Sequence, residues 1–322
     1  MARVVFLGTP FFGVPVLEAL VRHHEVVAVV TQPDRPVGRG RRTLEAPEVK
    51  RAAERHGLRV LQPVNLRRDR ATVQELRGVG ADVFVLAAFG QILRQEVLDI
   101  PPHGCIGVHA SLLPKWRGAA PIAAAILHGE LETGITLMLT DAGMDTGAII
   151  AQEALAIAPD DTTGTLTERL ARLGARLLID TLPAWLAGAI TPRPQDDALA
   201  TYAPMISRDD AHIDWRRSAR EIDCLIRAYT PWPGAFTTLD GETLKVVRAH
   251  PTAGEGAPVL PGTVMEVGGG LGVQTGEGVI ILDAVQLAGR RVMDAAAFAR
   301  GRRGFVGSVL GSEAAPDTLR GR

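Results

Sequence analysis

Short apolar runs alternate with longer amphipathic stretches along the first 200 residues, and this alternation limits the possible folds more than any other feature. Apolar, β-branched runs of this length are typical of strands that are buried on both faces of a sheet. We expect strands at RVVFLG (3–8), EVVAVVT (25–31), DVFVLAAF (82–89), CIGVHA (105–110) and GITLMLT (134–140), and helices at 14–23, 46–57 and 163–188. This order predicts βαβ units on a mostly parallel, Rossmann-like α/β sheet.

A change of pattern after residue 190 indicates a second domain. A proline-bearing segment is followed by a helix near 219–229 and then by short strands separated by turns, with Asp240-Gly241 as a hairpin turn. These features predict a small OB-like β-barrel. A chain of 322 residues is long enough for two domains. The expected boundaries are 1–190 for the α/β domain, 191–207 for a linker, 208–312 for the barrel and 313–322 for a loose tail.

The composition argues against several classes of protein. The formal net charge is −1, so any contact with nucleic acid must use local basic patches. Cys105 and Cys224 have no neighbours at metal-ligand spacing, which predicts neither a zinc site nor a disulfide framework and suits a reducing cytoplasm. The first apolar run stops at Gly8, and we find no run of about 18 apolar residues, so we expect neither a signal peptide nor membrane contact.

Two glycine-containing segments lie in the first third of the chain. GTPFFG (8–13) joins a predicted strand to a predicted helix but lacks the spacing of dinucleotide- and phosphate-binding loops. This argues against a nicotinamide-dependent oxidoreductase, and we expect the turn to let the helix pack close to the sheet. TQPDRPVGRGRRTLEAPEV (31–49) carries Arg39, Arg41 and Arg42 among prolines and glycines. It is either a solvated loop or an arm that contacts phosphates.

His109 and Asp145 are candidates for proton transfer. His109 ends one predicted strand, and Asp145 follows GITLMLT in the segment DAGMDTGAII. If the two strands are parallel neighbours, both side chains lie at the carboxyl edge of the sheet, where open α/β sheets form ligand crevices. A carboxylate beside an imidazole fixes its tautomer and raises its basicity. A histidine at a strand end and an aspartate in a glycine turn are also common structural residues, so both interpretations remain open.

Several motifs in the same order resemble the methionyl-tRNA formyltransferases. They are TQPDRPVGRG, AAFGQIL (87–93), HASLLPKWRGAAPI (109–122), GMDTG (143–147), RAYTPWPGAF (227–236) and DAAAFARGR (294–302). The resemblance implies formyl transfer from 10-formyltetrahydrofolate to the α-amino group of methionyl initiator tRNA. It implies catalytic roles for His109 and Asp145, and a folate-binding turn formed by Ser111, Leu112, Leu113 and Pro114.

The two substrates suggest further contacts. The backbone around Phe89 to Leu93 offers amide edges on apolar walls for a flat bicyclic ring, which makes Phe89, Gln91 and Ile92 candidate folate contacts. We expect tRNA to contact Arg39, Arg41 and Arg42, together with a basic run formed by Arg290, Arg291, Arg300, Arg302 and Arg303. The reaction requires no metal, and we expect a cytoplasmic monomer.

Gly107 departs from the Asn-Val-His motif of that family, because glycine stands where the asparagine belongs. Attack on the formyl carbon builds negative charge on its oxygen, which a side-chain amide would stabilise. The loss of one such donor typically lowers turnover on the order of 10²–10³-fold. The chain is therefore a slow enzyme, an enzyme in which water replaces the amide, or an inactive relative that binds folate or RNA. A formyltransferase for a small amine, such as a sugar nucleotide or glycinamide ribonucleotide, is a further alternative that does not need the arginine loop.

Overall fold

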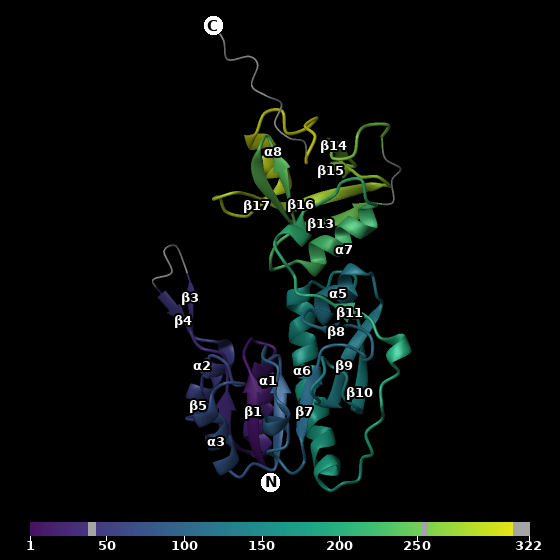
Figure 1. Ribbon diagram of the computed structural model, residues 1–322. Coiled ribbons are helices and arrows are strands. Elements are labelled where there is room, and N and C mark those ends of the chain that lie inside the picture. The colour runs from purple at the N-terminus through teal and green to yellow at the C-terminus, as the bar shows by residue number, and fades with distance from the viewer. Residues whose placement is uncertain (38–42, 253–256, 312–322) are drawn as a thin grey trace. The chain divides into compact units, whose positions relative to one another are not determined.

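The computed structural model describes residues 1–37, 43–252 and 257–311, which form two compact units (Figure 1). The first unit contains Met1–Pro121, Glu132–Ala156 and Leu166–Pro204. The second contains Ile122–Leu131, Ile157–Thr165 and the chain from Met205 onwards. In the described ranges no helix combines the length and the apolar character needed to cross a bilayer.

A seven-stranded sheet in the order β10-β9-β7-β6-β1-β2-β5 forms the centre of the first unit. Its strands are β1 (Arg3–Gly8), β2 (Glu25–Val30), β5 (Val60–Leu61), β6 (Val83–Ala87), β7 (Cys105–His109), β9 (Glu132–Leu139) and β10 (Ile149–Ala156). Five neighbouring strands, β7, β6, β1, β2 and β5, run parallel. β9 and β10 are antiparallel to their neighbours. The predicted mostly parallel sheet is therefore confirmed.

Helices follow most of these strands. They are α1 (Gly13–His23), α2 (Glu48–Arg55), α3 (Arg70–Gly78), α4 (Gln95–Leu98), α5 (Pro121–Leu127) and α6 (Thr163–Leu186). In α1, Val16, Leu17 and Leu20 are fully buried, as their helical spacing predicts. A Cβ atom at Gly13 would lie 3.1 Å from Val49 Cγ2 and 3.2 Å from the carbonyl oxygen of Ala87. The expectation that this glycine turn lets the first helix pack close to the sheet is thus confirmed.

The direction of β9 differs from the expected one. β9 pairs with β7 in antiparallel register, with His109 opposite Thr136 and Gly107 opposite Met138. The expectation that these strands are parallel and that both end at the same edge of the sheet was wrong, because apolar periodicity indicates a strand but not its direction. β9 ends beside Ile106, and the loop after it must turn back to bring Asp145 towards His109.

Two short strand pairs of the first unit lie outside the seven-stranded sheet. β3 (Arg35–Val37) and β4 (Thr43–Glu45) form an antiparallel pair. Arg39, Arg41 and Arg42, which join them, lie outside the described residues. β8 (Arg117–Gly118) pairs in parallel with β11 (Tyr202–Ala203), and the short helix η1 (Asp197–Leu199) precedes β11. Part of the predicted linker thus belongs to the first unit.

The second unit is built on an antiparallel sheet in the order β12-β13-β16-β15-β14, with β17 beside β16. Its strands are β12 (Phe236–Leu239), β13 (Glu242–Thr252), β14 (Val264–Val267), β15 (Gly270–Gln274), β16 (Val279–Leu287) and β17 (Met293–Asp294). Its helices from residue 205 onwards are η2 (Asp209–Ala211), α7 (Ala219–Ala228) and α8 (Ala295–Gly301). Asp240 and Gly241 have φ angles of 52° and 79° in the β12–β13 turn, which confirms the predicted hairpin. The sheet is that of a small barrel, as predicted.

Candidate active site

His109 is the last residue of β7, and its ring is nearly buried. Its Nε2 atom lies 3.0 Å from the carbonyl oxygen of Trp116. A carbonyl oxygen only accepts hydrogen bonds, so this contact places a proton on Nε2 and leaves Nδ1 as the acceptor of the neutral ring. Nδ1 lies 3.6 Å from Oδ1 of Asp145. The structure thus brings together the two residues that the sequence singled out for proton transfer.

Asp145 lies in the loop between β9 and β10, with a φ angle of 55°. Its Oδ2 atom accepts a hydrogen bond of 2.8 Å from the backbone N–H of Gly118. The amide of Gln195 donates to the carbonyl oxygens of Asp145 and Gly147 at 2.8 and 2.7 Å. These bonds fix the loop and one carboxylate oxygen, and they leave the other oxygen facing His109. The turned-back loop explains how Asp145 reaches His109 although β9 runs antiparallel to β7.

Arg117 is a buried residue that stabilises this loop. Its side chain is only 2% exposed. The guanidinium donates to Oε1 of Gln195 at 3.1 and 2.8 Å and to Oδ1 of Asp197 at 2.7 Å. Gln195 therefore joins a buried arginine to the loop that carries Asp145. No local pattern in the sequence points to these roles, since Gln195 lies 50 positions after Asp145 in a segment that resembles a linker.

The turn from Ser111 to Pro114 is anchored to the end of the sheet. Thr136, opposite His109 on β9, donates its hydroxyl to the carbonyl of Ser111 at 2.7 Å and accepts from the N–H of Leu113 at 3.0 Å. The amide of Gln152 donates to Thr136 Oγ1 and to the carbonyl of Leu113 at 2.9 and 2.8 Å. Ser111 and Leu113 are buried, whereas Leu112 and Pro114 are partly exposed. Thr136 is a polar residue inside an apolar run, and this break in the pattern could have indicated its role in holding the turn.

The segment of Phe89, Gln91 and Ile92 follows β6. Phe89 is buried, and its carbonyl accepts hydrogen bonds from Thr9 and Gln32 at 2.9 and 3.1 Å. The Gln91 side chain accepts from the N–H of Leu66 at 2.8 Å and donates to the carbonyl of Pro63 at 3.2 Å. Ile92 is 57% exposed. Two of the three side chains are thus engaged within the protein, so a ligand would meet chiefly the backbone and Ile92.

Gly107 shares one face of β7 with His109, because residues two apart on a strand point the same way. Its φ angle is not positive, so an L-residue fits its backbone. A Cβ atom would lie 3.0 Å from Met138 Cε and 3.1 Å from Thr140 Oγ1. Both neighbours are side-chain atoms, and a larger residue would displace a flexible methionine rather than backbone.

The pKa values of Asp34 and Cys105 in the first unit are shifted. Asp34 accepts hydrogen bonds from Gln62 at 2.7 Å and from Lys50 at 2.8 Å, and these bonds lower the pKa of its carboxyl. Burial raises the pKa of the Cys105 thiol on β7 to about 12, so this thiol stays protonated and is a poor nucleophile. Throughout the described ranges, no three or more His, Cys, Asp or Glu side chains lie together in an arrangement that could hold a metal ion.

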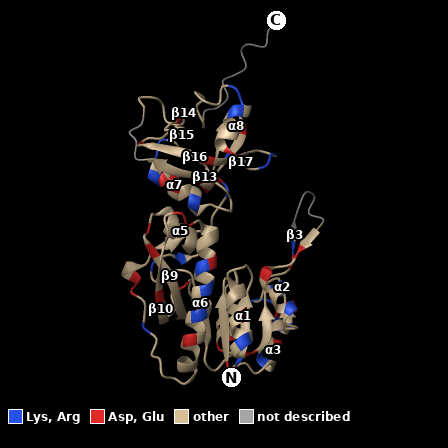
Figure 2. Cartoon of the chain, turned by 180° about the vertical axis from the view of Figure 1, so that it is seen from behind, with Lys and Arg blue, Asp and Glu red and all other residues tan. Residues whose placement is uncertain are grey.

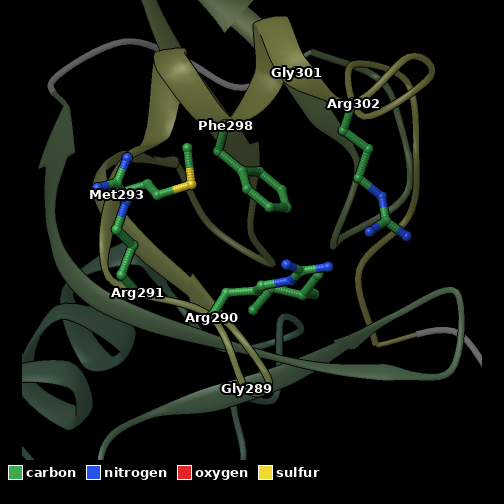
Figure 3. Close-up of a pocket in the computed structure, with 8 residues that line it drawn as sticks. Gly289, Arg290, Arg291, Met293, Phe298, Gly301 and Arg302 are labelled. Atoms are coloured by element: carbon green, nitrogen blue, oxygen red, sulfur yellow. The ribbon is translucent and has the colours of Figure 1, made fainter.

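A cavity of about 660 Å³ lies in the second unit (Figure 3). Its lining residues are Leu287, Gly289, Arg290, Arg291, Met293, Phe298, Gly301 and Arg302. Phe298 points into the cavity towards Arg290, while Arg302 pairs with Asp240 at 2.8 Å and with Glu242 at 3.3 Å. Basic residues also mark α8, although both signs of charge are interspersed over the second unit (Figure 2). Three of the five arginines of the predicted basic run thus line one cavity.

Comparisons with known proteins agree with this architecture. Residues 2–182 match the formyl transferase family, and residues 205–303 match the formyl transferase C-terminal domain. The methionyl-tRNA formyltransferase of Roseiflexus sp. (strain RS-1) is 50% identical over 315 residues, covering 97% of this chain and 96% of that protein. The methionyl-tRNA formyltransferase of Roseiflexus castenholzii (strain DSM 13941 / HLO8) is 49% identical over 311 residues, covering 96% and 99%.

A solved structure shares the fold at low identity. It is the N-formyltransferase from Helicobacter canadensis in complex with folinic acid and dTDP-3-aminofucose, with a TM-score of 0.67 and 20% identity. The match covers 88% of this chain and 99% of that one. The two matched families together span more than half of the sequence, and near-full-length relatives are about half identical to it. The chain therefore belongs to the methionyl-tRNA formyltransferase family.

Proposed function

We propose that this chain transfers the formyl group of 10-formyltetrahydrofolate to the α-amino group of methionyl initiator tRNA. The observation that carries the chemistry is the pair formed by His109 Nδ1 and Asp145 Oδ1, 3.6 Å apart at the end of β7. The observation that supports the substrates is the near-full-length similarity to methionyl-tRNA formyltransferases. Because formylated initiator tRNA serves translation initiation, the proposal places the chain in the cytoplasm.

The reaction needs a group that moves a proton. The neutral amine attacks the formyl carbon, a new C–N bond forms, and the bond from that carbon to the folate nitrogen breaks. The amine loses one proton while the folate nitrogen gains one. In our proposal, Nδ1 of His109 accepts the proton and returns it to the leaving nitrogen, directly or through a water molecule. Asp145 orients the ring and stabilises the imidazolium that forms.

The fixed surroundings of the pair favour this role. The Trp116 carbonyl holds Nε2, so the imidazole presents the same nitrogen to the substrate in every turnover. The N–H of Gly118 holds one oxygen of Asp145. At 3.6 Å, the distance between Nδ1 and Oδ1 is longer than a hydrogen bond. The gap is too narrow to hold a further heavy atom, but a water molecule or the reacting amine beside the pair can contact both atoms.

The folate donor is assigned to the two segments that flank this pair. Leu112 and Pro114 of the anchored turn are partly exposed, and Ile92 is exposed on the segment after β6. Apolar side chains of this kind suit the faces of a flat bicyclic ring, and backbone amides suit its polar edge. The side chains of Ser111, Leu113, Phe89 and Gln91 act in our proposal by shaping these segments, since they are buried or hydrogen-bonded within the protein.

Transfer RNA is assigned to the local basic groups, because the net charge of the whole chain is only −1. These groups are Arg39, Arg41 and Arg42 between β3 and β4, and Arg290 and Arg291 at the cavity of the second unit. Guanidinium groups on phosphates position a nucleic acid and make its affinity depend on salt. We propose that the chain acts as a monomer.

The test is a transfer assay with matched acceptors. The purified chain is incubated with 10-formyltetrahydrofolate and with methionyl initiator tRNA, free methionine, a dTDP-amino sugar or glycinamide ribonucleotide. We expect formylmethionine on the tRNA and no product from the other acceptors. Formylation of the amino sugar or the ribonucleotide instead would replace tRNA as the substrate. Binding of folate and tRNA without any product would identify an inactive relative.

A further inference from the structure

Thr140 carries a hydroxyl group that the described part of the protein leaves unused. The residue follows β9 directly, and its backbone N–H donates to the carbonyl of Cys105 at 2.7 Å. Its Oγ1 atom is buried and has no hydrogen-bond partner among the described residues. A buried polar group without a partner is unfavourable, and such groups often serve a ligand or a reaction.

The position of this hydroxyl relates it to Gly107. Gly107 is opposite Met138 in the β7–β9 pair, and Thr140 lies two positions after Met138. The Thr140 oxygen is 3.1 Å from the place where a Cβ atom at Gly107 would stand. His109 is two positions after Gly107 on the same face of β7. The hydroxyl therefore lies next to Gly107, on the side away from His109, in the space that an asparagine at position 107 would enter.

We propose that the Thr140 hydroxyl donates a hydrogen bond to the formyl oxygen in the transition state, as the donor that Gly107 lacks. This inference rests on the proposed function. When the amine attacks, the π electrons of the formyl C=O bond move to oxygen, and the hydroxyl stays protonated while it stabilises that charge. A hydrogen bond to the developing oxyanion is stronger than one to the ground-state carbonyl, so the contact raises kcat.

Met138 covers this position. Its Cε and Cγ atoms would lie 3.0 and 3.3 Å from a Cβ at Gly107, next to the Thr140 oxygen. An unbranched thioether side chain adapts its rotamer readily. In our account it gives way when the formyl group enters, and the burial of the Thr140 Oγ1 atom keeps water from competing for the hydroxyl.

A packing role is the alternative, in which Thr140 only fills space next to a glycine. Two substitutions separate the roles. Thr140→Val keeps the shape and removes the donor, whereas Thr140→Ser keeps the donor and removes a methyl group. A donor role makes the valine variant the slower one, and a packing role makes the serine variant the worse one. Thr133→Val is the matched control, because Thr133 Oγ1 on β9 is also buried without a partner among the described residues but lies at the opposite end of that strand.

The experiment measures kcat and both KM values for the parent, Thr140→Val, Thr140→Ser, Gly107→Asn and the Gly107→Asn/Thr140→Val double variant. We expect Thr140→Val to lower kcat about 10²-fold with unchanged KM values, as for the loss of one oxyanion donor. Thr140→Ser, which keeps the donor, stays well above Thr140→Val, and the control Thr133→Val, measured in the same way, retains the parental rate. In the Gly107→Asn background the valine substitution has less than about a tenfold effect, because the amide supplies a donor. Thermal melting checks that each variant folds.

The outcomes separate this inference from the proposed function. A parental kcat in Thr140→Val overturns the role of Thr140. A parent without turnover beside an active Gly107→Asn variant also overturns it, but leaves the function of the family site intact. No formylmethionine from any of the proteins overturns both proposals.

Discussion

His109 and Asp145 are both held by the same three-residue segment. The carbonyl of Trp116 contacts Nε2 of His109 at 3.0 Å, and the N–H of Gly118 donates to Oδ2 of Asp145 at 2.8 Å. The residue between them, Arg117, is buried and bound to Gln195 and Asp197. The separation of 3.6 Å between the imidazole and the carboxylate thus depends on a backbone segment that is itself fixed by a buried guanidinium.

Gln195 is a positioning residue in this account. Gln195→Leu removes the amide that holds the carbonyls of Asp145 and Gly147 and leaves Arg117 with one fewer partner. We expect kcat to fall while the KM for the folate donor stays unchanged, because Gln195 touches the Asp145 loop and not the assigned folate segments. A raised KM for the folate donor together with the lowered kcat would indicate only a general loss of structure.

Thr136 should stabilise the turn after His109. Thr136→Val leaves the carbonyl of Ser111 and the N–H of Leu113 without their partner inside the protein. Unmet buried hydrogen bonds of this kind cost about 1–3 kcal/mol of unfolding free energy. Thr133→Val is again the control, because it removes a buried hydroxyl that has no partner within the described chain. Denaturant unfolding should show a clear loss of stability for the first variant and almost none for the second. Equal losses would mean that the Thr136 bonds contribute little.

Apolar runs predicted four of the five parallel strands and the motifs predicted the reactive pair, but neither predicted β5 or the contacts that hold the pair. Buried apolar runs marked β1, β2, β6 and β7 because both faces of these strands are covered. β10 was not predicted, since its residues change from buried to partly exposed along the strand and form no continuous apolar run. The direction of β9 depends on long-range pairing, and Gln195 acts across 50 positions. Neither property leaves a local signal.

Asp34 directly precedes β3, the strand that leads to Arg39, Arg41 and Arg42. Its carboxyl allows a pH-dependent test of how the start of this segment is stabilised. Hydrogen bonds from Gln62 and Lys50 lower the pKa of its carboxyl below the unfolded value of about 3.9. The carboxylate therefore stabilises the fold above that unfolded value, and the contribution disappears as the pH falls through the folded pKa. Asp34→Asn should lower the melting temperature at pH 7, and the difference from the parent should shrink towards pH 3. The exposed Asp160→Asn variant is the control. A difference that does not change with pH would exclude the ionised carboxylate as its source.

Arg39, Arg41 and Arg42 should contribute to tRNA binding through phosphates. Replacing all three with alanine should weaken the binding of methionyl initiator tRNA and flatten the dependence of log Kd on log salt. The slope should change by up to about 0.9 for each duplex phosphate that the variant no longer neutralises. Folate affinity should not change. Arg67, Arg68 and Arg70 are exposed elsewhere on the first unit, and their triple alanine variant is the matched control. Equal tRNA affinity and salt slope in the parent and the first variant would make the segment an ordinary solvated loop.

The central claim is that the His109–Asp145 pair moves the protons of formyl transfer to methionyl initiator tRNA. Single-turnover formation of formylmethionyl-tRNA, with saturating 10-formyltetrahydrofolate, tests it most directly in the parent, His109→Ala and Asp145→Ala. We predict rates lowered on the order of 10²–10⁴-fold in His109→Ala, and strongly in Asp145→Ala, with tRNA affinity unchanged. A rate near that of the parent in either variant would contradict the assignment of that residue to proton transfer.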